Sequence, residues 1–299
     1  MSTSYREFSH RQFIERVRVA WRELKDCRLC ARECGVDRTA GERGFCRTKC
    51  LPAVASFGPH PGEEAPLRGT RGSGTIFFCG CNLRCVYCQN YDISRADSGW
   101  EISLSRLGRI MLSLEHRGCH NVNLVSPSHV IPQVIAGLFW AAERGLSIPI
   151  VFNTAGYDAL RGLKLLDGLV DIYMPDMKYA DSETAERLSA APDYPEVNRE
   201  SVKEMHRQVG NLKLDERGLA CRGLLVRHLV LPGGLAGTGK IVQFIADEIS
   251  PETYTNVMGQ YYPAYRAHEF EDLDKPTTRS DLRSALKMAR GVGLRRVHF

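Results

Sequence analysis

Three cysteines follow a short apolar run at a spacing that suits an iron–sulfur cluster. Cys81, Cys85 and Cys88 stand in the pattern C-x3-C-x2-C, after residues 75–78, which read as the end of a strand. Three thiolates in one tight loop can hold three irons of a cubane and leave the fourth iron without a protein ligand. Such an open position admits a ligand that takes part in chemistry. The alternative is a zinc knuckle with Cys79 as the fourth ligand.

A second group of cysteines precedes the first. Cys27, Cys30, Cys34 and Cys46 lie in a polar, turn-rich segment, and Cys50 follows just beyond them. Such a segment buries little apolar surface, so it needs a cross-link such as a bound metal to hold its fold. The spacing therefore predicts a second metal site, either zinc or an iron–sulfur cluster, because both accept four thiolates. The other interpretation is free thiols in a mobile arm.

The composition is that of an ordinary globular protein. Of 299 residues, 43% are hydrophobic and 25% are charged, and the net charge is +5. The Lys and Arg residues form no long run, so no nucleic-acid partner is expected. The first residues lack the apolar core of a signal peptide, and no apolar run is long enough for a membrane span. With eleven cysteines, these features predict metal-bound cysteines and a cytoplasmic location.

The elements that must position the cysteines alternate along the chain from residue 73 onward. Short apolar runs predict strands at 75–78, 121–125, 149–153, 170–174, 224–231 and 254–260. Longer amphipathic segments between them, and a last one at 279–291, predict helices. This alternation implies a parallel sheet with right-handed crossovers. In barrels of this kind, functional residues lie at the carboxyl ends of the strands.

The domain boundary is expected near residue 72. Residues 73–299 are predicted to form an α/β core with a C-terminal helix, and residues 1–72 an N-terminal extension that carries the second cysteine group. Within the extension, the spacing of apolar residues predicts an amphipathic helix over 8–25. The prolines and glycines of 51–72 predict a linker or an irregular wrap.

The cysteine loop resembles the signature loop of the radical S-adenosylmethionine (SAM) superfamily. Its surroundings, FFCGCNLRCVYCQN, are similar to the branch of pyruvate formate-lyase activating enzymes and their uncharacterised relatives. The resemblance covers about residues 73 to 290 and implies an open, partial (β/α)6 barrel. It also implies a [4Fe-4S] cluster on Cys81, Cys85 and Cys88, with SAM on the open iron. An external one-electron donor of the flavodoxin or ferredoxin type would reduce the cluster.

Polar residues at the expected strand ends extend the resemblance to SAM binding. Asp176 and Lys178 are similar to the Asp-x-Lys motif of the activating enzymes, and they suit the ammonium and carboxylate groups of an amino acid. Arg227 stands at the matching place of an Arg-x-x-x-x-Pro-Gly strand. Asn153 resembles the polar residue that other members direct at SAM, and Tyr87 is expected near the adenine.

Several of these positions have a structural alternative. The activating enzymes carry a Gly-Gly-Glu motif after the second strand, where this chain has Ser126-Pro127-Ser128-His129. The hydroxyls of Ser126 and Ser128 are candidates to replace its contacts with SAM, and the alternative is a cap of the following helix. Asn153 has the same alternative, and Asp176 with Lys178 would otherwise be a surface pair of little worth. His228, on the opposite strand face from Arg227, is expected to be structural.

The reaction implied by the resemblance is that of a radical SAM oxidoreductase. Reductive cleavage of SAM gives methionine and a 5′-deoxyadenosyl radical, which takes a hydrogen atom from the substrate. The leading expectation for the substrate is a glycine of a partner protein, which becomes a glycyl radical enzyme. Modification of another peptide or of a small molecule is the alternative. A different class of function is an iron–sulfur electron carrier or metal-binding module without catalysis.

Overall fold

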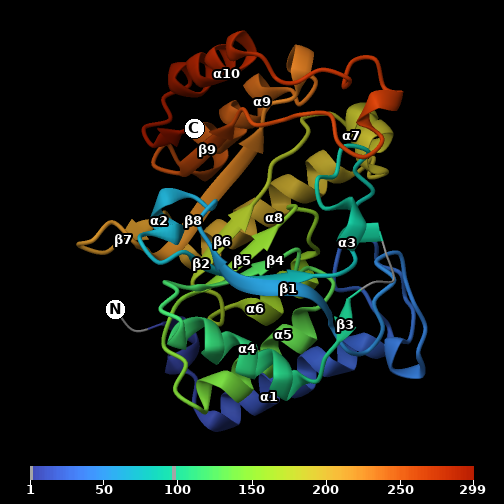
Figure 1. Cartoon of the computed structure of the whole chain (residues 1–299), viewed down its shortest axis with the longest axis vertical. Coiled ribbons are helices and arrows are strands. Elements are labelled where there is room, and N and C mark those ends of the chain that lie inside the picture. Colours follow the sequence, from blue (N-terminus) through green and yellow to red (C-terminus); the bar gives the residue numbers. More distant parts are fainter. Residues whose placement is uncertain (1–2, 96–98) are drawn as a thin grey trace.

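The computed structural model describes residues 3–95 and 99–299, whose strands form one sheet (Figure 1). The strand order is β10-β9-β8-β6-β5-β4-β2-β1-β3, and β7 pairs with β8. The strands are β1 (Ala53–His60), β2 (Ser73–Phe78), β3 (Trp100–Glu101), β4 (Val122–Val125), β5 (Ile150–Thr154), β6 (Ile172–Pro175), β7 (Lys213–Leu214), β8 (Ala220–Leu229), β9 (Tyr254–Met258) and β10 (Val297–His298).

The helices follow the strands in sequence. The α-helices are α1 (His10–Arg22), α2 (Ala65–Arg68), α3 (Tyr91–Arg95), α4 (Leu104–His116), α5 (Ile131–Ala142), α6 (Leu160–Leu166), α7 (Ser182–Ser189), α8 (Tyr194–Val209), α9 (Thr238–Phe244) and α10 (Arg279–Gly291). Helix α10 matches its predicted range of 279–291, and the Thr278–Asp281 capping box marks its start, as the Ser103 cap marks the start of α4. Within the described residues, each helix is too short or too polar to cross a lipid bilayer.

The central strands β2, β4, β5, β6, β8 and β9 run parallel to one another. Of these, β2, β4, β5 and β6 are buried almost throughout, as expected of parallel strands that helices cover. The described part of the sheet stays open, with β3 at one end of its strand order and β10 at the other. The predicted α/β architecture, a partial barrel of parallel strands, is therefore confirmed. The carboxyl ends of its strands bring the predicted strand-end residues to the same side of the barrel.

The segment 51–72 is more regular than its prolines and glycines predict. Residues 53–60 form β1, which pairs antiparallel with β2 and covers that edge of the parallel strands. Pro59 is tolerated in this strand because β3 pairs with β1 at Ala53 and Val54, away from the proline. The prediction of an irregular wrap is thus wrong for these residues.

Helix α2 follows β1 and bridges the gap between β2 and β9, the two outermost of the central parallel strands. The Asn256 side chain of β9 donates a hydrogen bond to Glu64, just before α2, at 2.9 Å. Leu67 of α2 is fully buried with Leu225 and Tyr254 in the barrel interior. The connection between β1 and β2 therefore lies across the open side of the barrel, where its polar residues can reach the site.

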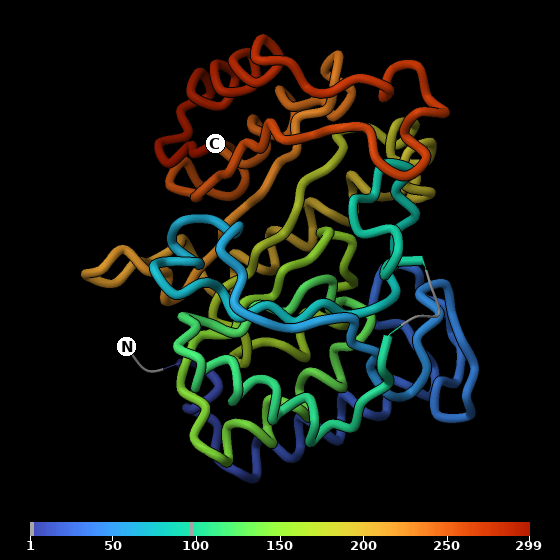
Figure 2. The backbone as a smooth tube through the Cα atoms, viewed as in Figure 1, coloured from blue at the N-terminus to red at the C-terminus, as the bar shows by residue number. Residues whose placement is uncertain are grey.

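The predicted N-terminal helix is confirmed as α1, which is followed by a 3-10 turn at Glu23–Lys25. Its apolar face packs on α5, where the rings of Phe13 and Phe139 lie 5.3 Å apart. The buried residues of α1 belong to the same hydrophobic core as the barrel helices. The backbone trace places this first part of the chain along the outside of the barrel (Figure 2).

Candidate active site

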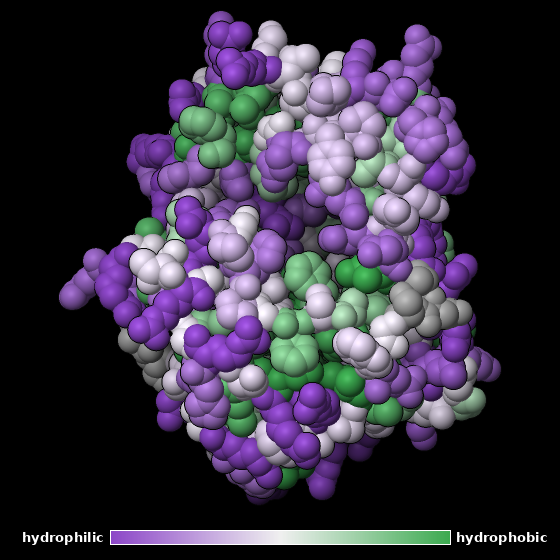
Figure 3. Space-filling model, in the orientation of Figure 1, coloured by the Kyte–Doolittle hydropathy of each residue, from purple (hydrophilic) through white to green (hydrophobic). Residues whose placement is uncertain are grey.

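A cavity of about 720 Å³ lies at the carboxyl ends of the parallel strands. The face of the molecule that carries α2 and α3 is hollowed near its centre (Figure 3). Nine of the ten residues predicted to hold the cluster and SAM line this cavity: Cys81, Tyr87, Cys85, Cys88, Ser126, Asn153, Asp176, Lys178 and Arg227. Among the described residues, the tenth candidate, Ser128, does not line it, and its hydroxyl lies 3.0 Å from that of Thr154. Residues from five different parts of the chain thus meet in one place.

The cysteine loop leaves the end of β2 through a glycine that no other residue could replace easily. Gly80 has φ +84°, and a Cβ at this position would lie 2.5 Å from the Cys46 carbonyl oxygen. Beyond it, Cys81, Cys85 and Cys88 turn toward the cavity. Cys79 points elsewhere, with its sulfur against Gly99, and among the described residues it does not line the cavity. The zinc knuckle with Cys79 as fourth ligand therefore has no support in the geometry.

The surroundings of the three sulfurs fit an iron–sulfur cluster. The Leu83 N–H donates to Cys81 Sγ at 3.4 Å, the Ser189 hydroxyl donates to Cys85 Sγ at 3.0 Å, and Cys88 Sγ lies 3.4 Å from the Ser94 hydroxyl. Hydrogen bonds to the sulfurs are a common means of tuning cluster ligands. No three His, Cys, Asp or Glu side chains of the described residues are arranged around a single metal ion. The three thiols line one cavity, as the ligands of a multi-iron cluster would.

Two thiols of this loop, those of Cys81 and Cys85, need a cationic partner to ionise. Burial, together with the neighbouring Cys85, raises the pKa of Cys81 to about 12. Burial also raises the pKa of Cys85, although Lys178 opposes that shift. A cluster supplies the positive charge that stabilises all three thiolates. The donor set and its electrostatics therefore agree with the predicted [4Fe-4S] ligands.

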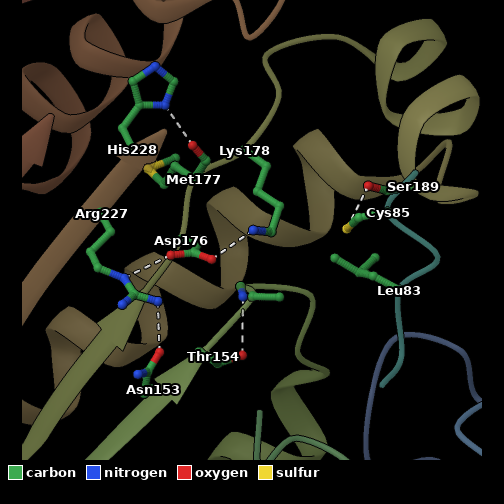
Figure 4. Close-up of polar contacts among 12 residues, drawn as sticks. Leu83, Cys85, Asn153, Thr154, Asp176, Met177, Lys178, Ser189, Arg227 and His228 are labelled. Atoms are coloured by element: carbon green, nitrogen blue, oxygen red, sulfur yellow. Dashed lines mark hydrogen bonds and ion pairs between the residues drawn. The ribbon is translucent and has the colours of Figure 1, made fainter. Parts of the chain in front are cut away.

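Four polar residues from three neighbouring strands form a connected network on the cavity wall (Figure 4). Asp176, just after β6, accepts hydrogen bonds from Lys178 Nζ at 2.7 Å and from Arg227 Nε at 2.9 Å. Arg227 of β8 also donates through Nη2 to Asn153 Oδ1 of β5 at 2.8 Å. Parallel pairing places Asp176 opposite Arg227, which explains why residues 51 positions apart meet. Asn153 is therefore not a helix cap.

The network is charged and largely buried. Burial would raise the pKa of Asp176, but Arg227 and Lys178 outweigh burial and hold it below its usual value. Burial would lower the pKa of Lys178, but Asp176 and Cys85 keep it raised. Both side chains of this pair are only about 15% exposed, so they are no surface pair of little worth. Ordered, ionised side chains of both signs suit a zwitterionic ligand.

Two carboxylates that the sequence analysis missed also line the cavity. Glu63 lies 3.9 Å from Arg227 and its side chain is 9% exposed, and Glu64 accepts the hydrogen bond from Asn256. Burial raises the pKa of Glu63 to about 7, an effect that Arg227 opposes and Glu64 supports. Both residues come from the segment 51–72, whose prolines and glycines predict a linker or an irregular wrap. Only the path of that segment across the barrel brings them to the site.

The raised pKa of Glu63 predicts a pH-dependent stability. A proton binds more tightly to this carboxyl in the folded chain, so its contribution is complete below pH 4.5 and is lost as pH rises toward 7. We expect Glu63→Gln to remove this loss of unfolding free energy, which amounts to at most about 3 kcal/mol at pH 8. Urea unfolding at pH 5 and pH 8 measures it, with the exposed Glu216→Gln as control. The same pH dependence in Glu63→Gln and the parent would contradict the assignment.

The remaining predicted residues have clear surroundings. Ser126 lines the cavity with φ +58°, and its N–H donates to the Asn153 carbonyl at 2.8 Å. The N-cap of α5 is Val130 and no side chain caps it, so the capping alternative for Ser126 and Ser128 is wrong. Tyr87 is buried in the cavity wall, where its hydroxyl pairs with that of Tyr179.

His228 is structural, as predicted. It is fully buried on the strand face away from the cavity. Its Nδ1 lies 2.7 Å from the Met177 carbonyl oxygen, and its Nε2 lies 2.8 Å from the Thr238 hydroxyl. Burial lowers its pKa, which is the usual result for a neutral core histidine.

The second cysteine group lies outside this cavity. Cys27, Cys30, Cys34 and Cys46 line a separate small cavity of about 10 Å³, together with Arg38 and His129 among others. Burial raises the pKa of Cys30 well above its usual value, and the nearby thiols of Cys46, Cys27 and Cys34 raise it further. The four residues are therefore neighbours in space, although eleven residues stand between Cys34 and Cys46 in the sequence.

Comparisons with known proteins identify the family of this chain. The sequence profile of the radical SAM superfamily matches residues 75–214. An uncharacterized protein of Methanocaldococcus jannaschii, MJ0674, is 34% identical over 289 residues, which cover 93% of this chain and 78% of that protein.

Two solved structures extend the comparison. HydG, a maturase of the [FeFe]-hydrogenase, has a TM-score of 0.50 at 13% identity, over 73% of this chain and 48% of that chain. Streptococcus suis SuiB bound to the precursor peptide SuiA has a TM-score of 0.47 at 13% identity, over 70% of this chain and 43% of that one. This chain thus spans less than half the length of either solved chain, and the likeness to HydG shows the shared fold. The chain therefore belongs to the radical SAM superfamily, whose members are enzymes that use a [4Fe-4S] cluster and SAM.

Proposed function

We propose that this enzyme cleaves SAM reductively at its signature loop and uses the product to take a hydrogen atom from a peptide substrate. The observation that carries the first half is the shared cavity. The three signature cysteines and the network of Asp176, Lys178 and Arg227 line the same space of about 720 Å³. That volume lies in the upper part of the usual range for ligand sites, about 300–1,000 Å³. It leaves room for a substrate beside SAM.

The residues of the network would divide the task of orienting SAM. Asp176 is the acceptor for the ammonium group, and the two cations that flank it are donors for the carboxylate. A guanidinium suits a carboxylate because its N–H groups match the two oxygens. Tyr87 closes one wall through its edge-on contact with Tyr261, whose ring centroid lies 5.7 Å away. These packed rings exclude water from one side of the cavity.

The cofactors supply the chemistry, and the chain supplies position. When bound, the cluster and SAM would supply, with one electron from a donor of the flavodoxin or ferredoxin type, the reductive cleavage that gives methionine and a radical able to take a hydrogen atom. The thiolates of Cys81, Cys85 and Cys88 would hold the cluster, and the remaining iron would be available to SAM. The cavity walls hold substrate and cofactor close to each other.

Aromatic residues at the rim of the cavity support a protein as substrate. Phe299 lines the cavity and is 78% exposed. Tyr91 and Tyr262 each follow a residue that lines the cavity, and they are 45% and 53% exposed. Exposed aromatic side chains are typical anchors of protein interfaces. Together with the resemblance of the loop to activating enzymes, they favour a glycine of a partner protein as the hydrogen donor.

A small-molecule or different peptide substrate is the second candidate. The place of the Gly-Gly-Glu motif of the activating enzymes is taken here by Ser126–His129, and the Glu63–Glu64 pair adds acidic groups to the cavity. Both features would suit a ligand with donor groups of its own. The two candidates differ in where the transferred hydrogen originates.

Isotope transfer distinguishes the candidates. The reduced enzyme is incubated without oxygen with SAM and a glycyl radical enzyme that carries α-deuterated glycine. We expect deuterium in the 5′-deoxyadenosine and an electron paramagnetic resonance signal on the partner. Formation of unlabelled 5′-deoxyadenosine with every such partner would overturn the glycine proposal and leave SAM cleavage intact.

A further inference from the structure

We propose that Cys27, Cys30, Cys34 and Cys46 hold a second metal centre, which is a tetrathiolate site of zinc or of an iron–sulfur cluster. The argument does not depend on the proposed substrate. The four cysteines line one small cavity of about 10 Å³, which is separate from the cavity of the signature cysteines. Three of them are buried and Cys34 is exposed. The site therefore lies at the surface of the N-terminal segment, closed on its inner side.

The backbone of this segment turns so that the thiols face one another. Cys27 N–H donates to the Val36 carbonyl at 3.1 Å, and Gly35 N–H returns to the Cys27 carbonyl at 3.0 Å. Across the turn, Phe45 N–H donates to Cys34 Sγ at 3.4 Å. Hydrogen bonds from backbone N–H groups favour thiolates over thiols. The fold of the segment thus brings the four sulfurs together and provides a donor to one of them.

Arg38 is a second indication, independent of the cysteine arrangement, that the site of the four cysteines holds negative charge. It is 1% exposed, and its guanidinium donates to the carbonyls of Lys49 and His129 and to Cys27 Sγ, at 3.7 Å. Among the described residues, no carboxylate forms an ion pair with it. An arginine stays charged in proteins, and a buried charge is costly without an anionic partner.

A tetrathiolate centre provides that partner. Four thiolates around a Zn²⁺ ion, or around a [4Fe-4S]²⁺ core, carry a net charge of about −2, because four negative charges outweigh two positive ones. Thiols without metal would leave Arg38 next to a neutral sulfur. The buried guanidinium therefore points to metal-bound thiolates at Cys27 and its neighbours.

The spacing of the sulfurs does not contradict this assignment. No three His, Cys, Asp or Glu side chains among the described residues surround a single point as ion ligands do. The signature cysteines share this property, although the superfamily uses such cysteines to hold a cluster. Binding of a single ion would therefore require the thiolates to move closer together, whereas a cluster of several irons bridges more widely spaced thiolates.

The proposed centre lies directly against the signature loop. The Cys46 carbonyl oxygen occupies the space where Gly80 lacks a Cβ. Arg84 of the loop donates to the Phe45 carbonyl, and Arg32 donates to the Asn82 carbonyl at 2.8 Å. The residues between Cys27 and Cys46 contain one 3-10 turn as their regular structure, at Arg38–Ala40. A metal centre would cross-link this segment and support the signature loop that packs against it.

The test counts metal in chains that lack the signature cysteines. The full chain with Cys81, Cys85 and Cys88 changed to alanine is purified without oxygen and analysed for zinc, iron and sulfide. We expect it to retain about one equivalent of zinc, or about four of iron with sulfide for a cubane. Adding Cys27→Ser and Cys30→Ser should remove this metal, whereas adding Cys221→Ser, outside both cavities, should not.

Either metal would support the site and identify its kind. Absence of bound metal in the triple variant, before and after reconstitution with zinc or with iron and sulfide, would overturn the proposal. Alkylation of the parent protein tests the same site without any substitution, so its result does not depend on whether the variants fold. We expect Cys27, Cys30, Cys34 and Cys46 to resist alkylation until a chelator removes the metal. Equal labelling of the exposed Cys34 with and without chelator would contradict the site.

Discussion

Replacing Cys85 by alanine is expected to abolish SAM cleavage. The loop would keep two of its three cluster ligands, and the thiol that accepts the Ser189 hydrogen bond would be gone. Because the chemistry depends on the cluster that these ligands hold, we expect 5′-deoxyadenosine to fall to the background of the assay. The measurement is 5′-deoxyadenosine formed per enzyme under reducing conditions, together with the iron content of the purified chain.

Cys79→Ala is the matched control for this change. Cys79 is a buried cysteine of the same loop, but its sulfur contacts Gly99 and does not line the cavity. We expect this variant to retain the signature cluster and most of the activity. If Cys85→Ala cleaves SAM at the rate of the parent, the assignment of the cluster ligands is wrong. If both variants lose the cluster equally, the distinction between Cys79 and the other three fails.

Replacing Asp176 by asparagine is expected to weaken SAM binding and to destabilise the chain. The carboxylate lies between Lys178 and Arg227, and its removal leaves two largely buried cations without their shared partner. Breaking a buried pair in this way costs about 3–5 kcal/mol. Glu63, at 3.9 Å from Arg227, offsets part of that cost. Loss of only 1.4 kcal/mol from binding raises the Kd for SAM about tenfold.

Equilibrium binding of SAM and thermal unfolding together test this expectation. The control is Asp272→Asn, which removes the partner of Arg187 in a pair that is about 40% exposed. Such a surface pair contributes about 1 kcal/mol or less, so the control should change Tm little and SAM binding not at all. An Asp176→Asn variant that binds SAM as the parent does would exclude Asp176 as a ligand of its ammonium group.

Much of the fold and of the site could be predicted because the two depend on the same periodic pattern. Apolar runs such as 150–154 lie buried between helices, and their length sets them apart from the amphipathic helices. Once parallel pairing is accepted, the residues that follow the strands must meet. The resemblance to radical SAM motifs identifies Asn153, Asp176 and Arg227 as SAM-binding candidates, and parallel pairing explains why these residues, distant in sequence, lie in one network.

The parts that were missed depend on the path of irregular segments. Nothing local indicates that Glu63 and Glu64 reach the cavity, because the position of α2 is set by Leu67, which enters the barrel interior. The short strand β10 was missed for a similar reason, since its two residues pair with β9 only through the packing of α10. Tertiary contacts, and not local propensity, decide such elements.

Cleavage of SAM by the reconstituted enzyme tests the central claim most directly. The chain is loaded with iron and sulfide without oxygen, its iron at the signature loop is confirmed, and it is reduced in the presence of SAM. The shared cavity of the three cysteines with Asp176, Lys178 and Arg227 predicts equal amounts of methionine and 5′-deoxyadenosine. A fully loaded, reduced enzyme that forms no 5′-deoxyadenosine would contradict the account and favour an iron–sulfur electron carrier.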